Sequence, residues 1–392
     1  MRRAVEGLVR GLRRRADPLW GIHIEAAVAE RGIRRVVCFH TDHFEPFEDT
    51  REAGTSLALV EAFIDAHRDA PHARRASVFL LPPCHVSRTA PTDAARVLEA
   101  PDDGLVFSWS QETLDQFDAV TQALDASNHD TQLHIHHETW TQRDARLRPL
   151  DEVGDWLAAR STPHRDARRF EAYLRHVVGW IGEARGRPFS DWGFVHGKWA
   201  LNGSDRSVCQ IDSEMEILLR HGCRGDFTFP AGRPHCDPAV PRPFACRPVS
   251  CAKGYDSPLA QPRPLGGDRR TLGPDRMFIW SSGVAHENAS VDIYAPWIAR
   301  RAARPTWTVA RWFRDGAVID GTLFVKTHAH SMAAPYWHNR APQFPLASPL
   351  VTAVFEALAR RCDAHQLDLE YWSVRQVMDW MTEVDDRRDE PR

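Results

Sequence analysis

The segment RRVVCFHTDHF (residues 34–44) joins an apolar run to a group of polar residues. Valine, cysteine and phenylalanine in an unbroken run are typical of a strand buried on both faces of a parallel sheet. The polar residues that end the segment would then lie at the carboxyl end of that strand. Because active sites of parallel α/β proteins form at the carboxyl ends of strands, this one segment predicts both the fold class and the position of the site.

Strand-like and helix-like segments alternate on both sides of this segment. Further strands are expected at residues 76–84, 131–137, 191–201, 223–230, 277–282 and 321–330. Helices are expected at residues 56–69, 110–127 (with Ser110 as N-cap), 168–186, 208–222, 348–366 and 373–384. Repeated β–α units favour a parallel sheet or a (β/α) barrel. Residues 231–275 are rich in proline and glycine without a periodic pattern, and they are predicted to form a long loop at the rim of the site.

The composition is that of a folded protein with no strong charge. The 392 residues are 43% hydrophobic and 26% charged, and 50 basic against 53 acidic side chains give a net charge of −3. Such a balance argues against nucleic acid as the main partner. No apolar run reaches the roughly 18 residues of a membrane span, so a cytoplasmic protein is expected. Residues 1–32 predict a basic helical arm that packs on the domain, with weak contact to an acidic membrane surface as the alternative.

Cysteine and histidine have different uses in this chain. Because no signal peptide is expected, the eight cysteines argue against a disulfide framework, and the absence of a CxxC pair argues against a structural zinc motif. Five of them are expected as small core residues: Cys38, Cys84, Cys209, Cys223 and Cys362. The 20 histidines are clustered, and such clusters indicate a transition-metal site because imidazole is the commonest metal ligand.

The segment TQLHIHH (131–137) provides the first pair of candidate ligands. Alternate residues of a strand face the same way, so His134 and His136 would project together toward one divalent metal. HTDHFEP (40–46) adds Asp42 and His43, a base and a ligand between them. Strict alternation puts these two on opposite faces, so both can serve only if the strand ends there. A turn or helix cap is the structural alternative for Asp42.

Two further segments supply candidate substrate and proton-transfer residues. FVKTHAH (324–330) places Lys326, His328 and His330 on one strand face, where a histidine could protonate a leaving amine. VHGKWAL (195–201) places His196 and Lys198 on one face, with Trp199 as a sugar-stacking surface or as plain core.

In order along the chain, the segments DHFEP, HIH, FVHGKWAL, GCRGDFTFP and FVKTHAH resemble the NodB-type polysaccharide deacetylases of the glycoside hydrolase/deacetylase superfamily. The resemblance implies a distorted (β/α) barrel of about seven strands, built as one large catalytic domain over residues 33–386. It also implies a divalent metal, commonly zinc, and removal of an N-acyl group, usually acetyl, from an amino sugar.

The resemblance further implies roles for individual residues. Asp42 matches the base, and His43 stands where the family has a metal-binding aspartate. The third ligand is therefore expected from the Asp42–His43 pair. His328 matches the general acid, and Asp226 matches the aspartate that tunes it. Two further positions depart from the family pattern. HIHH replaces two histidines spaced four apart, and His196 or Lys198 stands in place of an arginine that positions the base.

The predicted reaction is hydrolysis of an N-acyl group on an amino sugar or related amide. Asp42 would take a proton from the attacking water, and Lys198 or Lys326 would help to hold the oxyanion. One alternative is hydrolysis of another C–N bond in a small metabolite, and a second is a catalytically silent carbohydrate-binding barrel. A third is a glycosidase that uses two carboxylates from the set Asp42, Glu45, Glu138 and Asp226.

Overall fold

The computed structural model describes residues 17–47, 55–83, 85–87, 92–99, 106–136, 139–141, 146–148, 165–230, 235–266, 273–281, 290–292, 304–331 and 344–382. Residues 1–16 of the expected N-terminal arm lie outside the described residues, as do Cys84, His137 and Glu138. The rest of the arm is helical. None of the helices in the described part of the chain combines the length and the apolar composition of a membrane span.

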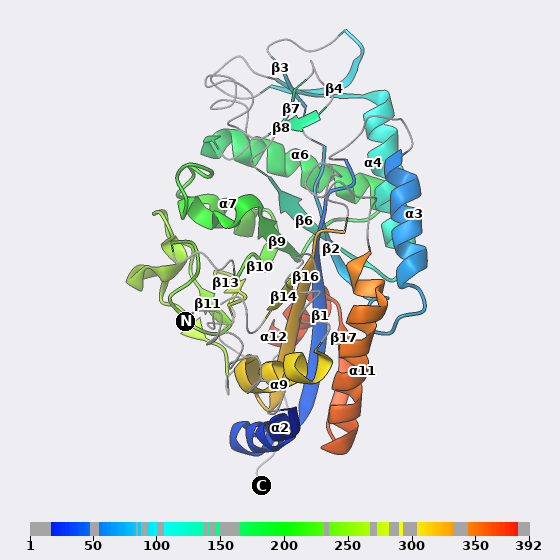
Figure 1. Ribbon diagram of the computed structural model, residues 1–392. Helices are drawn as coiled ribbons and strands as arrows, with labels where there is room; N and C mark the ends of the chain where they lie inside the picture. Colours follow the sequence, from blue (N-terminus) through cyan, green and yellow to red (C-terminus); the bar gives the residue numbers. More distant parts are fainter. Residues whose placement is uncertain are drawn as a thin grey trace, which may run out of the picture.

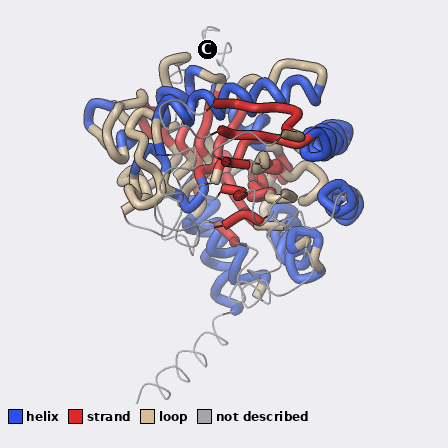
Figure 2. Tube along the Cα trace, turned by 90° about the horizontal axis from the view of Figure 1, so that it is seen from above, coloured by secondary structure: helices blue, strands red, loops and turns tan. Residues whose placement is uncertain are grey.

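A large, mostly parallel sheet forms the centre of the molecule (Figures 1 and 2). Its parallel strands, in spatial order, are β13 (Met277–Ile279), β10 (Cys223–Asp226), β9 (Trp192–His196), β6 (Asp130–Ile135), β2 (Ser77–Leu80), β1 (Arg35–Phe44), β16 (Thr322–Ala329) and β14 (Ser290–Asp292). β17 (Asp368–Trp372) runs parallel to β1, and β15 (Ala317–Ile319) runs antiparallel to β16. The predicted α/β class is thereby confirmed.

Helices surround the strands, as the view from above shows (Figure 2). They are α2 (Asp17–Arg31), α3 (Thr55–His67), α4 (Gln111–Ala126), α6 (Ala167–Arg185), α7 (Glu214–Arg220), α9 (Pro305–Asp315), α11 (Pro349–Ala364) and α12 (Val374–Thr382). Local chemistry fixes several of their ends. The Ser110 side chain caps α4 by accepting from the Thr113 amide, as predicted, and α6 ends at Gly186 with φ 63°.

A second, smaller sheet packs on α4 and α6 and was not predicted. Its strands are β4 (Ala94–Glu99), β5 (Val106–Ser110), β3 (His85–Ser87), β7 (Thr139–Thr141) and β8 (Arg146–Arg148). Phe107 and Trp109 of β5 lie in one apolar core with Tyr173 and Trp180 of α6. Single turns of 3-10 helix complete the fold: η3 (Gly197–Trp199), η4 (Leu201–Gly203), η5 (Gly254–Asp256), η6 (Pro258–Ala260) and η8 (Pro345–Ala347).

The large sheet is strongly curved. Phe39 of β1 and Trp280, which follows β13, have ring centroids 4.7 Å apart. Five strand spacings separate β1 from β13 in the sheet, so a flat sheet would hold them about 24 Å apart. We call the concave side that carries these rings the inner face; it also holds Val195 and Phe227. The other side, the outer face, packs on the helices.

The amino ends of the strands are closed by α12. The Val374 amide donates to Oγ of Ser77, the first residue of β2, at 2.7 Å. The Arg375 amide donates to the carboxylate of Asp130, the first residue of β6, at 2.9 Å. Val374, together with Met378 from the next turn, belongs to the inner-face core. The carboxyl ends of the strands lie at the end of the inner face opposite α12.

The segment predicted as a long loop, residues 231–275, contains regular structure. β11 (Phe244–Cys246) pairs antiparallel with β13, and β12 (Arg263–Pro264) pairs with β11. Buried Cys236, Tyr255 and Leu265 anchor the segment to the rest of the protein. The expectation of an irregular loop was wrong over these strands, because antiparallel strands of three and two residues are too short to carry a periodic signal.

Candidate metal centre

Histidines from three strands meet on the inner face at the carboxyl ends of β1, β6 and β16. The ring centroid of His43 lies 5.1 Å from that of His134, 4.4 Å from that of His330 and 6.2 Å from that of His328. His136 follows β6, and its ring centroid is 5.3 Å from that of His134. We call these side chains, together with Glu45, the inner-face cluster: His43, Glu45, His134, His136, His328 and His330. Parallel strands explain the gathering, since their carboxyl ends share one edge.

Within the cluster, Glu45, His134 and His136 each offer one donor atom, and these atoms lie within 4.8 Å of one another. Nδ1 of His134 lies 2.8 Å from the carbonyl oxygen of Val195, and this contact requires the ring proton on Nδ1. In the neutral imidazole this leaves the lone pair on Nε2, which lies 3.2 Å from Oε1 of Glu45. The main chain of β9 thus orients His134 as a ligand, in the way that backbone carbonyls orient metal-binding histidines.

The cluster is buried on one side and reaches the surface on the other. Glu45, His134 and His328 are buried, whereas His136 and His330 are half-buried. Burial, with the charges of His330 and other neighbours, holds the pKa of His43 well below its usual value. His43 is therefore a neutral imidazole at neutral pH.

Asp42 does not join this cluster. β1 continues through Phe44, so alternation directs Asp42 to the outer face and His43 to the inner one. There the Asp42 carboxylate lies 3.3 Å from Nε2 of His40 and accepts from the amide of Ser331 at 2.9 Å and from its hydroxyl at 2.5 Å. Burial alone would raise the pKa of Asp42, but these hydrogen bonds bring it below its ordinary value. The expectation that Asp42 and His43 serve one site as base and ligand is not met, because the two side chains lie on opposite faces of the sheet.

Glu45 occupies the position expected of Asp42. It lies two residues after His43 in extended chain, on the same side, and the following Pro46 favours that extended backbone. From the sequence, Glu45 is expected only as a glycosidase carboxylate. The signal that could have identified Glu45 as a ligand was the alternation in HTDHFEP, continued by two residues from His43 to Glu45.

Lys326, His328 and His330 lie on the inner face, as alternation predicts. The ammonium group of buried Lys326 donates to the carbonyl oxygens of Phe227 and Phe229, the latter at 2.7 Å. Burial lowers the pKa of Lys326 to about 7, although nearby Asp226 opposes the shift. These hydrogen bonds tie β16 to the segment that follows β10.

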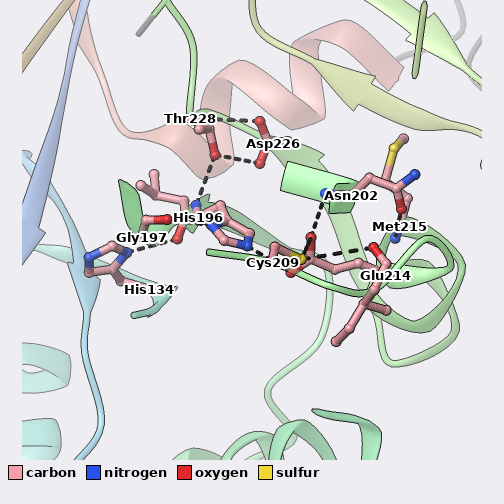
Figure 3. Close-up of polar contacts among 11 residues, drawn as sticks. His134, His196, Gly197, Asn202, Cys209, Glu214, Met215, Asp226 and Thr228 are labelled. Carbon is pink, nitrogen blue, oxygen red and sulfur yellow. Dashed lines mark hydrogen bonds and ion pairs between the residues drawn. The ribbon is translucent and has the colours of Figure 1, made fainter. Parts of the chain in front are cut away.

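His196 and Lys198 do not share a strand face. β9 ends at His196, and Lys198 follows in η3 with φ 56°. His196 pairs in register with Ile135 and turns to the outer face, while the neighbouring pair of His134 and Val195 turns inward. Figure 3 shows the imidazoles of His134 and His196 directed away from each other. Trp199 is half-buried and packs against the outer-face core. The expectation failed because the strand is shorter than its apolar pattern suggested.

The side chain of Asp226 is hydrogen-bonded to Thr228. Its carboxylate accepts from the Thr228 amide at 3.1 Å and from the Thr228 hydroxyl at 2.8 Å (Figure 3). Burial raises the pKa of Asp226 to about 7, against the lowering effect of these hydrogen bonds. The Thr228 hydroxyl also accepts from the His196 amide at 2.8 Å. Asp226 thereby connects the ends of β9 and β10.

Two histidines and one glutamate are a ligand set that catalytic zinc sites use. The lone pair of His134 and the carboxylate of Glu45 face each other as such ligands would, so the residues fit a divalent metal. No protein-family model matches this sequence, and no curated protein or solved structure is detectably similar to it. The resemblance to the NodB-type deacetylases therefore stays a prediction.

Proposed function

We propose that this protein is a metal-dependent hydrolase that removes an N-acyl group, such as acetyl, from an amino sugar or a related small amide. The observation that carries the proposal is the convergence of Glu45, His134 and His136 beside further histidines. In this proposal, the curved sheet is the wall of the distorted (β/α) barrel that the sequence resemblance implies. The cluster then lies at the open, carboxyl-terminal mouth of that barrel.

In the proposed site, Glu45, His134 and His136 would hold the metal, with zinc expected. When bound, such an ion polarises an amide carbonyl and lowers the pKa of coordinated water to about 7. Val195 keeps the lone pair of His134 directed to the site through its carbonyl oxygen. The half-buried His136 and His330 form the edge from which a substrate would enter.

Proton transfers are assigned to the remaining inner-face histidines. His43 adjoins both the ligand His134 and His330, and it is assigned the role of taking a proton from the attacking water. His328 is assigned to protonate the departing amine. The base role expected of Asp42 is withdrawn because its carboxylate lies on the outer face.

Asp42 acts in this proposal as a positioning residue. Its carboxylate accepts from both the amide and the hydroxyl of Ser331, the residue that follows His330. It thereby fixes the end of β16, on which His328 and His330 depend for their orientation.

The arrangement favours amide hydrolysis over glycoside cleavage. A glycosidase needs two carboxylates about 5 to 9.5 Å apart across the scissile bond. Of the carboxylates considered for that reaction, Glu45 lies in the inner-face cluster, and Asp42 points to the outer face. Asp226 is bound to Thr228, and Glu138 lies outside the described residues.

The proposal is tested by following acetate release from N-acetylated amino sugars, their oligomers and simple acetanilides. We expect release from at least one of them, loss of release after treatment with a strong chelator, and recovery on addition of zinc. Carbohydrate binding without turnover would instead identify a silent binding protein. Release that survives complete metal removal would contradict the metal-dependent mechanism.

Gly197 provides a more local test, because it packs directly against His136. A β-carbon at position 197 would lie 2.6 to 2.8 Å from three atoms of His136, one of them its Cα. Gly197→Ala must therefore displace this ligand, and we expect metal affinity to fall by about 10- to 100-fold. Competition with a chromogenic chelator measures the affinity. Gly179→Ala, where a β-carbon meets nothing within 4 Å, is the control. Unchanged affinity in Gly197→Ala would exclude His136 from the ligand set.

A further inference from the structure

A second group of metal-ligating side chains lies on the outer face. His196, Cys209 and Glu214 come from the end of β9, the chain that follows η4 and the first turn of α7, and all three are fully buried. Each offers one donor atom, and these atoms lie within 4.8 Å of one another. Figure 3 shows the imidazole of His196 turned toward Cys209 and Glu214, away from His134.

This group is separate from the inner-face cluster. In the pairing of β6 with β9, His134 stands beside Val195 and Ile135 stands beside His196. Paired residues of neighbouring strands share a face, so His134 and His196 point to opposite sides of the sheet. The proposed hydrolysis uses none of these three side chains.

Two distances within the group are in the range found between neighbouring ligands of a zinc ion. Zinc bonds of about 2.0 to 2.3 Å place neighbouring donor atoms about 3.3 to 3.8 Å apart. Nε2 of His196 lies 3.3 Å from Oε1 of Glu214, and Sγ of Cys209 lies 3.8 Å from Oε2 of Glu214. Nδ1 of His196 lies 2.5 Å from the carbonyl oxygen of Gly197 and keeps its proton there, so the proton displaced by a bound metal would be the one on Nε2.

Charge balance and ligand type point to the same ion. One thiolate and one carboxylate neutralise a divalent cation, so the bound group would carry no net charge in this fully buried position. A thiolate with an imidazole selects zinc over magnesium or calcium, which prefer oxygen ligands.

We propose that His196, Cys209 and Glu214 bind a second zinc ion with a structural role. The proposal is independent of the activity proposed above. Glu214 also accepts from the Asn202 amide at 2.6 Å, and Nδ2 of Asn202 donates to the carbonyl oxygens of Val249 and Cys251. The ion would therefore join β9 and α7 to the segment that carries β11 and β12.

Cobalt substitution gives a signal specific to this site. Full-length protein produced in cobalt-supplemented medium is expected to show near-ultraviolet thiolate-to-cobalt charge-transfer absorption, because Cys209 supplies sulfur. The inner-face ligands contain no sulfur and cannot give this band. Cys209→Ala should lose the band and keep the visible absorption of the inner-face ion. Cys362→Ala, a buried cysteine of α11, is the control and should keep both.

The experiment distinguishes failure of the outer-face zinc site from failure of the inner-face metal site. His134→Ala should keep the charge-transfer band, so loss of the inner-face ion leaves this test intact. Glu214→Gln keeps the shape and the thiol and should reduce zinc content by one ion per chain. Cobalt protein without the band would overturn the proposal, as would a band that persists in Cys209→Ala. In either case the group is a metal-free ion pair. Burial alone would lower the pKa of His196, but Glu214 and Cys209 raise it well above its usual value, as such a pair requires.

Discussion

Zinc content is expected to fall by one ion per chain, and amide hydrolysis by about three orders of magnitude or more, when His134 is replaced with alanine. His134 is fully buried, and its Nε2 faces Glu45 at 3.2 Å. Alanine removes one of three ligands and leaves the carboxylate of Glu45 without its partner. Elemental analysis of protein purified without chelator measures the first effect, and initial rates of acetate release measure the second.

A matched control separates loss of the ion from loss of the fold. His365→Ala changes a histidine at the C-terminal end of α11, far along the chain from the cluster, and should leave zinc content and rate unchanged. His136→Ala should reproduce the defect of His134→Ala, because both side chains belong to the same ligand group. If His134→Ala is folded and keeps its full zinc content and its rate, Glu45, His134 and His136 do not form the catalytic centre.

The local pattern of the sequence was sufficient to predict the main elements of the fold. The apolar run that begins at Val36 forms β1, and alternation in HIHH brought His134 and His136 together. These predictions succeeded because strand geometry with a two-residue period relates residues that are close in sequence. The small sheet built from β3, β4, β5, β7 and β8 was missed because its strands are short and carry weak patterns.

The third ligand shows where local reasoning was incomplete. The third ligand was expected from the Asp42–His43 pair, because HTDHFEP places a carboxylate beside a histidine, although strict alternation puts these two residues on opposite faces. Which of these side chains faces the site depends on where β1 ends, and the apolar pattern alone does not fix that end. Once β1 reaches Phe44, His43 and Glu45 turn inward and Asp42 turns outward.

The outer-face group could not have been found from spacing. His196 is separated from Cys209 and Glu214 by η4 and a turn, and no known zinc motif has this spacing. Cys209 was interpreted as a small core residue, which is consistent with its full burial. Only the packing of α7 against the end of β9 brings the three donor atoms together.

His328→Ala is expected to keep the inner-face metal and to lose hydrolysis by on the order of 10² to 10⁴-fold, as for removal of a general acid. His328 lies on β16, whereas His134 and His136 come from β6 and the residue after it. Its ring centroid is 6.2 Å from that of His43, and it does not belong to the ligand group of Glu45. Zinc content and single-turnover rates at several pH values measure the two effects separately.

The competing acid is His330, whose ring lies nearer to His43, at 4.4 Å. A general acid matters most for a poor leaving group, so substrates that release a weakly basic amine should lose less rate in the alanine variant of the true acid. The alanine variant of the other histidine should lose rate equally for all substrates, because that change disturbs only the orientation of the groups around the substrate. His328 is buried and His330 is half-buried, so His328 is the better shielded from bulk water and is the one assigned this role. A leaving-group dependence that appears in His330→Ala instead would transfer the role to His330. A metal-free His328→Ala would make His328 a ligand.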